Sequence, residues 1–175
     1  NETSIGQVSA SHPQGYTITY AISESDSSIV SIDASTGSLS FTSTPDYETK
    51  STYSATLTAS SVDPNTNTTQ SATQDIAINI TDVNEAPAFT SSATFSAAEN
   101  QTAIDTVTAT DADGDSVTFT VSGSELEITS AGVLTFASAP DYETKSTYTA
   151  TVTATDGTNS TTQAITVNVT DVVEN

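Results

Sequence analysis

The chain has no cysteine, only two basic residues and a single histidine among its 175 residues. The lack of cysteine excludes thiol catalysis and cysteine-ligated zinc, and it leaves the compartment open because many extracellular repeats lack disulfides. One histidine without a G-x-S-x-G motif also excludes the common nucleophile–base arrangements. We therefore expect no enzymatic activity.

The charge of the chain is almost entirely of one sign. There are 22 acidic residues and a formal net charge of −20, so the chain repels DNA, RNA and anionic lipid, and we expect no nucleic-acid partner. No stretch is long and apolar enough for membrane insertion, and no signal peptide is visible. The acidic residues either form a solvated surface or include ligands for cations, and their positions in the sequence distinguish these two interpretations.

An internal repeat organises the sequence. Pro45–Tyr53 recurs without change as Pro140–Tyr148, at an offset of 95, whereas Thr81–Val83 recurs as Thr170–Val172, at an offset of 89. The first copy therefore holds six additional residues, and the Pro, Asn and Thr residues of segment 63–67 predict a lengthened hairpin loop there. Two domains are expected, over residues 1–85 and 86–175.

The join between the copies is short. It contains Pro87 and no glycine–serine run, so it does not resemble a flexible linker. The sequence begins in the middle of the repeat pattern at Asn1, which favours a fragment of a larger protein.

Apolar residues alternate with polar ones in both copies. Alternation with one buried face predicts antiparallel strands, and no window has helical spacing. The fold class is therefore all-β, with two tandem Ig-like Greek-key sandwiches of about seven strands each. The clearest strand signals are Tyr16–Ile22, Tyr53–Ala59, Ile76–Ile80, Val117–Val121, Val133–Phe136, Tyr148–Thr153 and Ile165–Val169.

The acids gather between the predicted strands. Asp111, Asp113 and Asp115 alternate in a glycine-containing loop, and three such carboxylates can converge on a hard cation such as Ca²⁺. The loop is not an EF-hand, because its glycine is the fourth residue instead of the sixth and Ser122 stands at the twelfth position. Further acids flank strand ends at Glu99, Asp141 with Glu143, Asp156, and Asp171 with Glu174.

These motifs, in this order, resemble the cadherin repeat. The family has a Glu near the start of the repeat, a D-x-D loop, a D-x-E motif, an Asp that ends an L-x-V-x-A-x-D strand, and a D-x-N-D-N linker. Glu99, Asp111–Asp113, Asp141–Glu143, Val152–Asp156 and Asp82–Pro87 match these in turn. The linker sequence D-V-N-E-A-P resembles the linkers of bacterial cadherin-like repeats more than those of animal ones.

The resemblance implies Ca²⁺ ions at the linker, held by both repeats and the segment that joins them. Val83 and Ala86 would contribute backbone carbonyls, and Asp82 and Asp115 would contribute further carboxylates. The implied metal ligands are Asp46, Glu48, Asp82, Val83, Asn84, Glu85, Ala86, Asp111, Asp113, Asp115 and Asp156. A further C-terminal half-site would comprise Glu99, Asp141, Glu143, Asp171 and Glu174, although Val173 replaces the linker asparagine there.

The first copy departs from the pattern. When Gly15 is aligned with Gly114, His12, Gln14 and Tyr16 stand where Asp111, Asp113 and Asp115 stand in the second copy. Ser61 likewise replaces Asp156. Repeat 1 thus lacks these acidic ligands at the end that carries the Gly15 loop, which we call its upper end. No calcium is expected there.

Three functions agree with these features. The favoured one is an extracellular module, secreted or on a bacterial cell surface, in which Ca²⁺ stiffens tandem repeats for adhesion or as a spacer. The alternatives are a calcium-dependent carbohydrate-binding module of a polysaccharide-degrading or surface protein, and a homophilic contact. Neighbouring repeats of the same chain are the first expected partners. Lys50 and Lys145, which follow the D-x-E motifs, are expected to be solvent-exposed.

Overall fold

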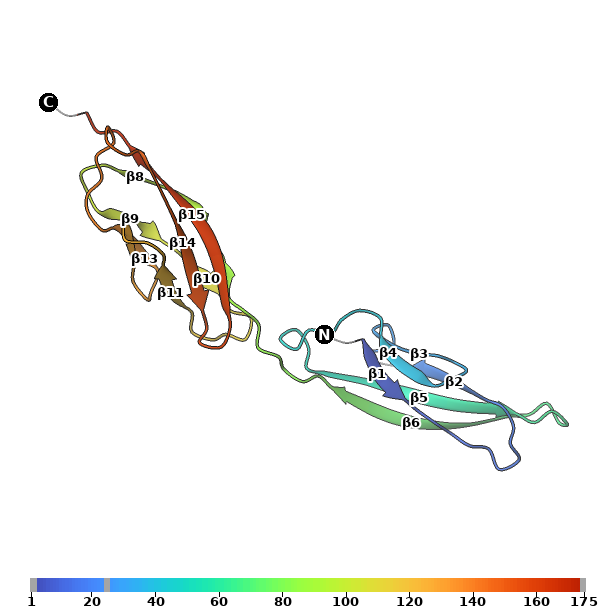
Figure 1. The fold of residues 1–175 in the computed structure, drawn as a ribbon. Helices are drawn as coiled ribbons and strands as arrows, with labels where there is room; N and C mark the ends of the chain where they lie inside the picture. Colours follow the sequence, from blue (N-terminus) through green and yellow to red (C-terminus); the bar gives the residue numbers. More distant parts are fainter. Residues whose placement is uncertain (1–2, 24–25, 174–175) are drawn as a thin grey trace. The chain divides into compact units, whose positions relative to one another are not determined.

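The computed structural model describes residues 3–23 and 26–173, and the chain folds into two compact units. Unit 1 comprises Asn1–Val83 and unit 2 comprises Asn84–Asn175. Within the described residues every regular element is a β-strand (Figure 1). These residues contain no helix with the length and apolar character that a membrane crossing requires.

Unit 1 is built from two three-stranded sheets. One sheet has the order β1-β4-β3 and the other β2-β5-β6, so both place strands that are distant in sequence side by side (Figure 1). The strands are β1 (Ser4–Gln7), β2 (Ile18–Ser23), β3 (Val30–Ile32), β4 (Ser38–Phe41), β5 (Thr52–Val62) and β6 (Thr69–Asn79).

Unit 2 repeats this arrangement and adds a strand to one sheet. Its larger sheet has the order β11-β14-β15-β8, with β8 parallel to β15, and the facing sheet has the order β12-β13-β9. Strands β7 and β10 form a separate pair. The bounds are β7 (Ala88–Phe89), β8 (Thr94–Ala98), β9 (Ala103–Thr106), β10 (Ala109–Thr110), β11 (Thr118–Val121), β12 (Leu126–Ile128), β13 (Val133–Phe136), β14 (Thr147–Thr155) and β15 (Ser160–Thr170).

The alternation in the sequence places one side chain in two inside each sandwich. In β15 the buried residues are Ile165, Val167 and Val169, and the residues between them remain partly exposed. Burying side chains of this size contributes about 1.5–3 kcal/mol each. The core of unit 2 also contains Phe95, Leu134, Phe136 and Val152, whereas that of unit 1 is centred on Val30, Leu39, Phe41, Tyr53 and Leu57.

The six additional residues of the first copy lengthen a whole hairpin and not its loop alone. The β5–β6 hairpin pairs Val62 with Thr69, whereas the β14–β15 hairpin already ends at the pair of Thr155 and Ser160. By the two sequence offsets, each of the two strands gains two residues and the loop gains the other two. The prediction of a longer loop was therefore correct only in part, since most of the insertion continues the ladder.

Candidate metal centre

The loop between β10 and β11 carries the first group of acids in unit 2. Asp111 organises it, because its Oδ1 accepts hydrogen bonds from the backbone nitrogens of Asp113 (3.0 Å) and Asp115 (3.3 Å). Gly114 has a φ of 81°, a left-handed conformation that suits glycine, and its N–H points to the Asp111 carbonyl at 3.4 Å. Asp111 and Asp113 are half-buried and Asp115 is exposed.

The turn of the β14–β15 hairpin supplies Asp156. Its Oδ1 accepts from the backbone nitrogens of Thr158 (2.5 Å) and Asn159 (2.6 Å), while its Oδ2 accepts from the Asn84 side-chain amide at 3.0 Å. The Asn84 hydrogen bond is the largest cause that lowers the pKa of Asp156, followed by the Asn159 backbone. This carboxylate is therefore held in its charged form.

The segment that enters unit 2 closes the site. The Glu85 backbone nitrogen donates to Asp113 Oδ2 at 2.9 Å, and the Asn159 side-chain amide donates to the Asn84 backbone carbonyl at 2.8 Å. These bonds explain why the units divide between Val83 and Asn84, two residues before the boundary expected from the sequence. Asn159 was missed by the sequence analysis because it serves the site through hydrogen bonds and not as an acidic motif residue.

Two carboxylate oxygens at this end of unit 2 lack a hydrogen-bond partner. Asp111 Oδ2 and Asp113 Oδ1 are both buried, and no donor within the described residues reaches either of them. Leaving buried charged oxygens without a donor is costly. A hard cation with six to eight oxygen ligands would satisfy them, so the donor set fits Ca²⁺.

The opposite end of unit 2 carries a second acidic cluster. Glu99 is only 3% exposed, and each of Glu99, Asp141 and Glu143 offers an oxygen within 4.8 Å of the others. Glu99 accepts hydrogen bonds from the backbone nitrogens of Tyr142 and Val172, both at 2.8 Å. These bonds tie the D-x-E turn to the end of β15.

Glu143 shows how strongly these charges repel one another. Its own backbone N–H lowers its pKa, but burial and the negative charges of Glu99, Asp171 and Asp141 outweigh that effect and raise it. Asp171 therefore belongs to the cluster electrostatically. Glu174, which the sequence also assigned to this half-site, lies outside the described residues.

In unit 1 the D-x-E turn has the same local structure. Asp46 accepts from the backbone nitrogens of Glu48 (3.1 Å) and Thr49 (3.2 Å), as Asp141 does for Thr144. The Thr49 hydroxyl is the largest cause that lowers the pKa of Asp46. A carboxylate oxygen of Glu48 also lies within 4.8 Å of one from Asp82. Val83 and Ala86, which were assigned through their backbone carbonyls, are exposed.

The upper end of unit 1 has the loop but not the acids. The Gly15 N–H bonds to the His12 carbonyl at 2.9 Å with a φ of 74°, which reproduces the turn at Gly114. Here the His12 and Tyr16 rings stack at 4.6 Å, and Ser61 is buried. Side chains of these types offer no carboxylate ligand for a hard cation.

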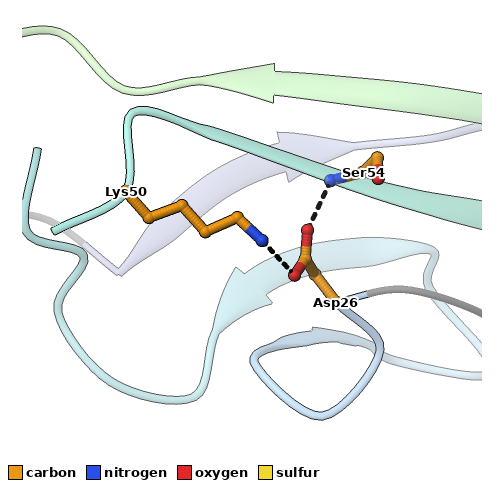
Figure 2. Close-up of polar contacts among 3 residues, drawn as sticks. All are labelled: Asp26, Lys50 and Ser54. Atoms are coloured by element: carbon orange, nitrogen blue, oxygen red, sulfur yellow. Dashed lines mark hydrogen bonds and ion pairs between the residues drawn. The ribbon is translucent and has the colours of Figure 1, made fainter.

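An ion pair in unit 1 was not foreseen. Figure 2 shows the Asp26 carboxylate between the Lys50 ammonium (2.5 Å) and the Ser54 backbone nitrogen (2.8 Å). The side chain of Asp26 is only 10% exposed, and Lys50 also lies 5.0 Å from the centroid of the Tyr53 ring. Lys145 makes the corresponding pair with Glu125. Both lysines are solvent-exposed as expected, with side chains 43% and 42% exposed, and each also forms an ion pair.

Each unit matches a known family model. Residues 1–81 match the family model of the cadherin domain, and residues 84–170 match that of a bacterial Ig domain. No curated protein sequence matches the chain.

Solved structures show the same two-domain fold. Human protocadherin-24 EC1-2 is similar with a TM-score of 0.66 at 19% identity, covering 94% of this chain and 87% of that one. Drosophila N-cadherin EC1-4 also has a TM-score of 0.66, at 21% identity, covering 98% of this chain and 46% of that one. Mouse cadherin-23 EC22-24 has a TM-score of 0.59 at 25% identity, and the match covers 89% of this chain but only 53% of that structure.

Proposed function

Because the chain is a tandem of cadherin-like Ig-type domains, a class of typically extracellular and non-enzymatic adhesion modules, we propose that it binds Ca²⁺ where its two domains join. The bound ion would stiffen the connection, so that the pair acts as a spacer or adhesion element. The module would belong to a secreted or surface protein, and the linker sequence D-V-N-E-A-P favours a bacterial origin.

One observation carries this proposal. The buried oxygens Asp111 Oδ2 and Asp113 Oδ1 lack a donor within the described residues, and they stand beside the segment through which the chain enters unit 2. Asp156, Asn84 and Glu85 belong to the same hydrogen-bonded group. An ion held here would therefore bind the connecting segment together with the body of unit 2.

The remaining residues stay predictions. The resemblance assigns Asp46, Glu48 and Asp82 of unit 1 to the same ions, and it assigns the cluster of Glu99, Asp141 and Glu143 to a half-site for a following domain. Within the described residues, we find no feature that favours a polysaccharide partner or a homophilic contact.

Calcium titration of an Asp113→Asn variant tests the proposal. The change removes one charge and keeps the shape, so we expect the calcium affinity at this site to fall about tenfold or more, measured by calorimetry. The wild-type chain should bind in the range of extracellular modules, with a Kd of roughly 10⁻⁴–10⁻³ M or somewhat tighter.

Glu127→Gln is the matched control. Glu127 is exposed on β12 and is not a member of either acidic cluster, so this variant loses the same charge and should bind calcium as the wild type does. Equal affinities in all three proteins would mean that the acids are only a solvated surface.

A further inference from the structure

One asparagine outside the acidic motifs holds the segment that enters unit 2. Asn159, in the turn between β14 and β15, donates a hydrogen bond from its side-chain amide to the Asn84 backbone carbonyl at 2.8 Å. The Asn84 side-chain amide donates in the opposite direction, to Asp156 Oδ2 in the same turn, at 3.0 Å. Two side-chain hydrogen bonds therefore fasten the segment to the turn at a single residue, and we call this arrangement the Asn84–Asn159 clasp.

The turn itself is held by bonds that do not involve the Asn159 side chain. Asp156 Oδ1 accepts from the Thr158 and Asn159 backbone nitrogens, at 2.5 and 2.6 Å. The Asn159 carbonyl accepts from the Thr155 hydroxyl at 2.8 Å and from the Asp156 backbone nitrogen at 3.3 Å. A change of the Asn159 side chain therefore removes its bond to Asn84 and leaves the bonds that fold the turn in place.

The clasp acts on the candidate calcium ligands through Glu85. Glu85 follows Asn84, and its backbone N–H donates to Asp113 Oδ2 at 2.9 Å. The other oxygen of this carboxylate, Asp113 Oδ1, is buried and has no hydrogen-bond donor within the described residues. By fixing Asn84, Asn159 thus fixes the N–H group that orients Asp113. Groups that are already held in their bound arrangement lose less conformational freedom when a ligand arrives, and this raises affinity.

Unit 1 lacks the counterpart of this asparagine where it also lacks the acids. By the offset of 89, Gln70 is equivalent to Asn159. Gln70 stands within β6 and pairs with Ser61 of β5, the residue that replaces Asp156. The β5–β6 ladder continues beyond this pair, so the six additional residues of the first copy remove the turn that presents Asn159 in unit 2. The asparagine and the acids thus occur together in one copy and are both missing from the other.

We propose that Asn159 is a positioning residue for the calcium site. It holds the Asn84–Glu85 segment against the rest of unit 2 before the ion binds, and so preassembles this part of the site without itself binding the ion. This inference rests on the proposed calcium site.

The clasp also locates the part of the connection that moves when calcium is absent. Asn84 is fastened to unit 2, and the Ile80 N–H is bonded to the Ser51 carbonyl of unit 1 at 2.8 Å. Between them, Thr81, Asp82 and Val83 are exposed, and none of the three makes a hydrogen bond within the described part of the chain. In the calcium-free chain the connection therefore bends before Asn84.

The test combines hydrogen exchange, followed by NMR in EDTA, with calorimetric calcium titration of the 175-residue chain. In Asn159→Ala we expect the Glu85 amide to exchange about three- to tenfold faster than in the wild type, because one hydrogen bond of the clasp is lost. The calcium affinity should fall by a similar factor. The Ile165 and Val167 amides should exchange as in the wild type, which shows that unit 2 remains folded.

Two further variants separate the hydrogen bond from packing and from the turn. Asn159→Asp keeps the shape of the side chain but cannot donate to the Asn84 carbonyl, so the Glu85 amide should exchange at least as fast as in Asn159→Ala. Thr158 is exposed in the same turn, and its side chain makes no hydrogen bond within the described residues. Thr158→Ala should therefore leave both measurements unchanged.

The outcomes distinguish this inference from the proposed function. The positioning role of Asn159 is overturned if the wild type binds calcium and Asn159→Ala binds it equally well. It is also overturned if Glu85 exchange is unchanged in Asn159→Asp, or if Thr158→Ala has the same effects as Asn159→Ala. A wild-type chain that binds no calcium would instead refute the proposed function, and the clasp would then be a contact of the fold alone.

Discussion

At the scale of single residues, the lysines are the informative exceptions in a strongly acidic chain. Each is the only lysine or arginine of its domain, and each pairs with an acid and lies near a tyrosine ring, at 5.0 Å for Lys50 and 4.5 Å for Lys145. Lys50 follows the D-x-E turn and bonds to Asp26 across the sandwich. Its ammonium is therefore paired with a carboxylate that is not among those we assign to calcium.

The Asp26 carboxylate makes the stability of unit 1 depend on pH. Its hydrogen bond to Lys50, then that from Ser54, lowers the pKa of Asp26. The stabilisation is therefore fully present above the unfolded pKa of about 3.9, and it is lost as the pH falls through the lower folded value. We expect Asp26→Asn to melt at a lower temperature than wild type at pH 7.

Thermal unfolding of unit 1 between pH 7 and pH 2 checks this. The difference between wild type and Asp26→Asn should shrink toward the acid end. A difference that is the same at both ends would show that the charge of Asp26 has no part in it.

At the scale of elements, a duplicated glycine fixes the turn that precedes β4 and β13. Gly132 has a φ of 90°, and a Cβ placed on it would lie 2.2 Å from the Val107 carbonyl oxygen. Gly37, its equivalent, would meet the Val8 carbonyl oxygen at 2.5 Å. Only glycine allows the chain to pass this close.

We expect Gly132→Ala to destabilise unit 2 by about 1–3 kcal/mol more than Gly123→Ala, because of the clash. Gly123 is the control, since it has a φ of 83° but open space around it, and its substitution should cost only about 1–2 kcal/mol for the backbone strain. Chemical denaturation of both variants measures the difference. Equal losses would mean that the turn moves away from the added methyl group.

The long strands were predictable because their alternation is strong and repeated. Tyr53–Ala59 lies within β5 and Ile165–Val169 within β15, as expected. Most of the short strands were not among the predicted runs, because two to five residues show little periodicity; these are β1, β3, β4, β7, β8, β9, β10 and β12.

The metal centre was predictable to the extent that its residues recur in a known order. The Asp26–Lys50 ion pair was not predictable. In the second copy Lys145 pairs with Glu125, and the repeated motifs of the sequence do not align Glu125 with Asp26. The hydrogen bonds of Asn84 and Glu85 with the rest of unit 2 could not be predicted from the motifs either, since they depend on how the hairpin turn and the loop approach each other.

At the scale of the whole molecule, each domain has its own core. Leu134 is fully buried, and its truncation to alanine should destabilise unit 2 by about 2–5 kcal/mol while unit 1 keeps its stability. Leu39→Ala, at the equivalent position of unit 1, should have the reciprocal effect. Hydrogen exchange resolved by domain measures both. A loss of protection in both units from either variant would contradict separate cores.

The central claim is that calcium fixes the connection between the domains. Without metal, Asp111, Asp113 and Asp156 gather negative charge around residues 84–85, and two like charges repel by roughly 1–4 kcal/mol when they come within about 4 Å of each other. Small-angle X-ray scattering of the wild-type chain, in calcium and then in EDTA, tests the claim most directly. We predict a single defined maximum dimension in calcium, a broader distribution in EDTA, and an EDTA-like distribution for Asp113→Asn even in calcium. Identical scattering in calcium and EDTA would contradict it.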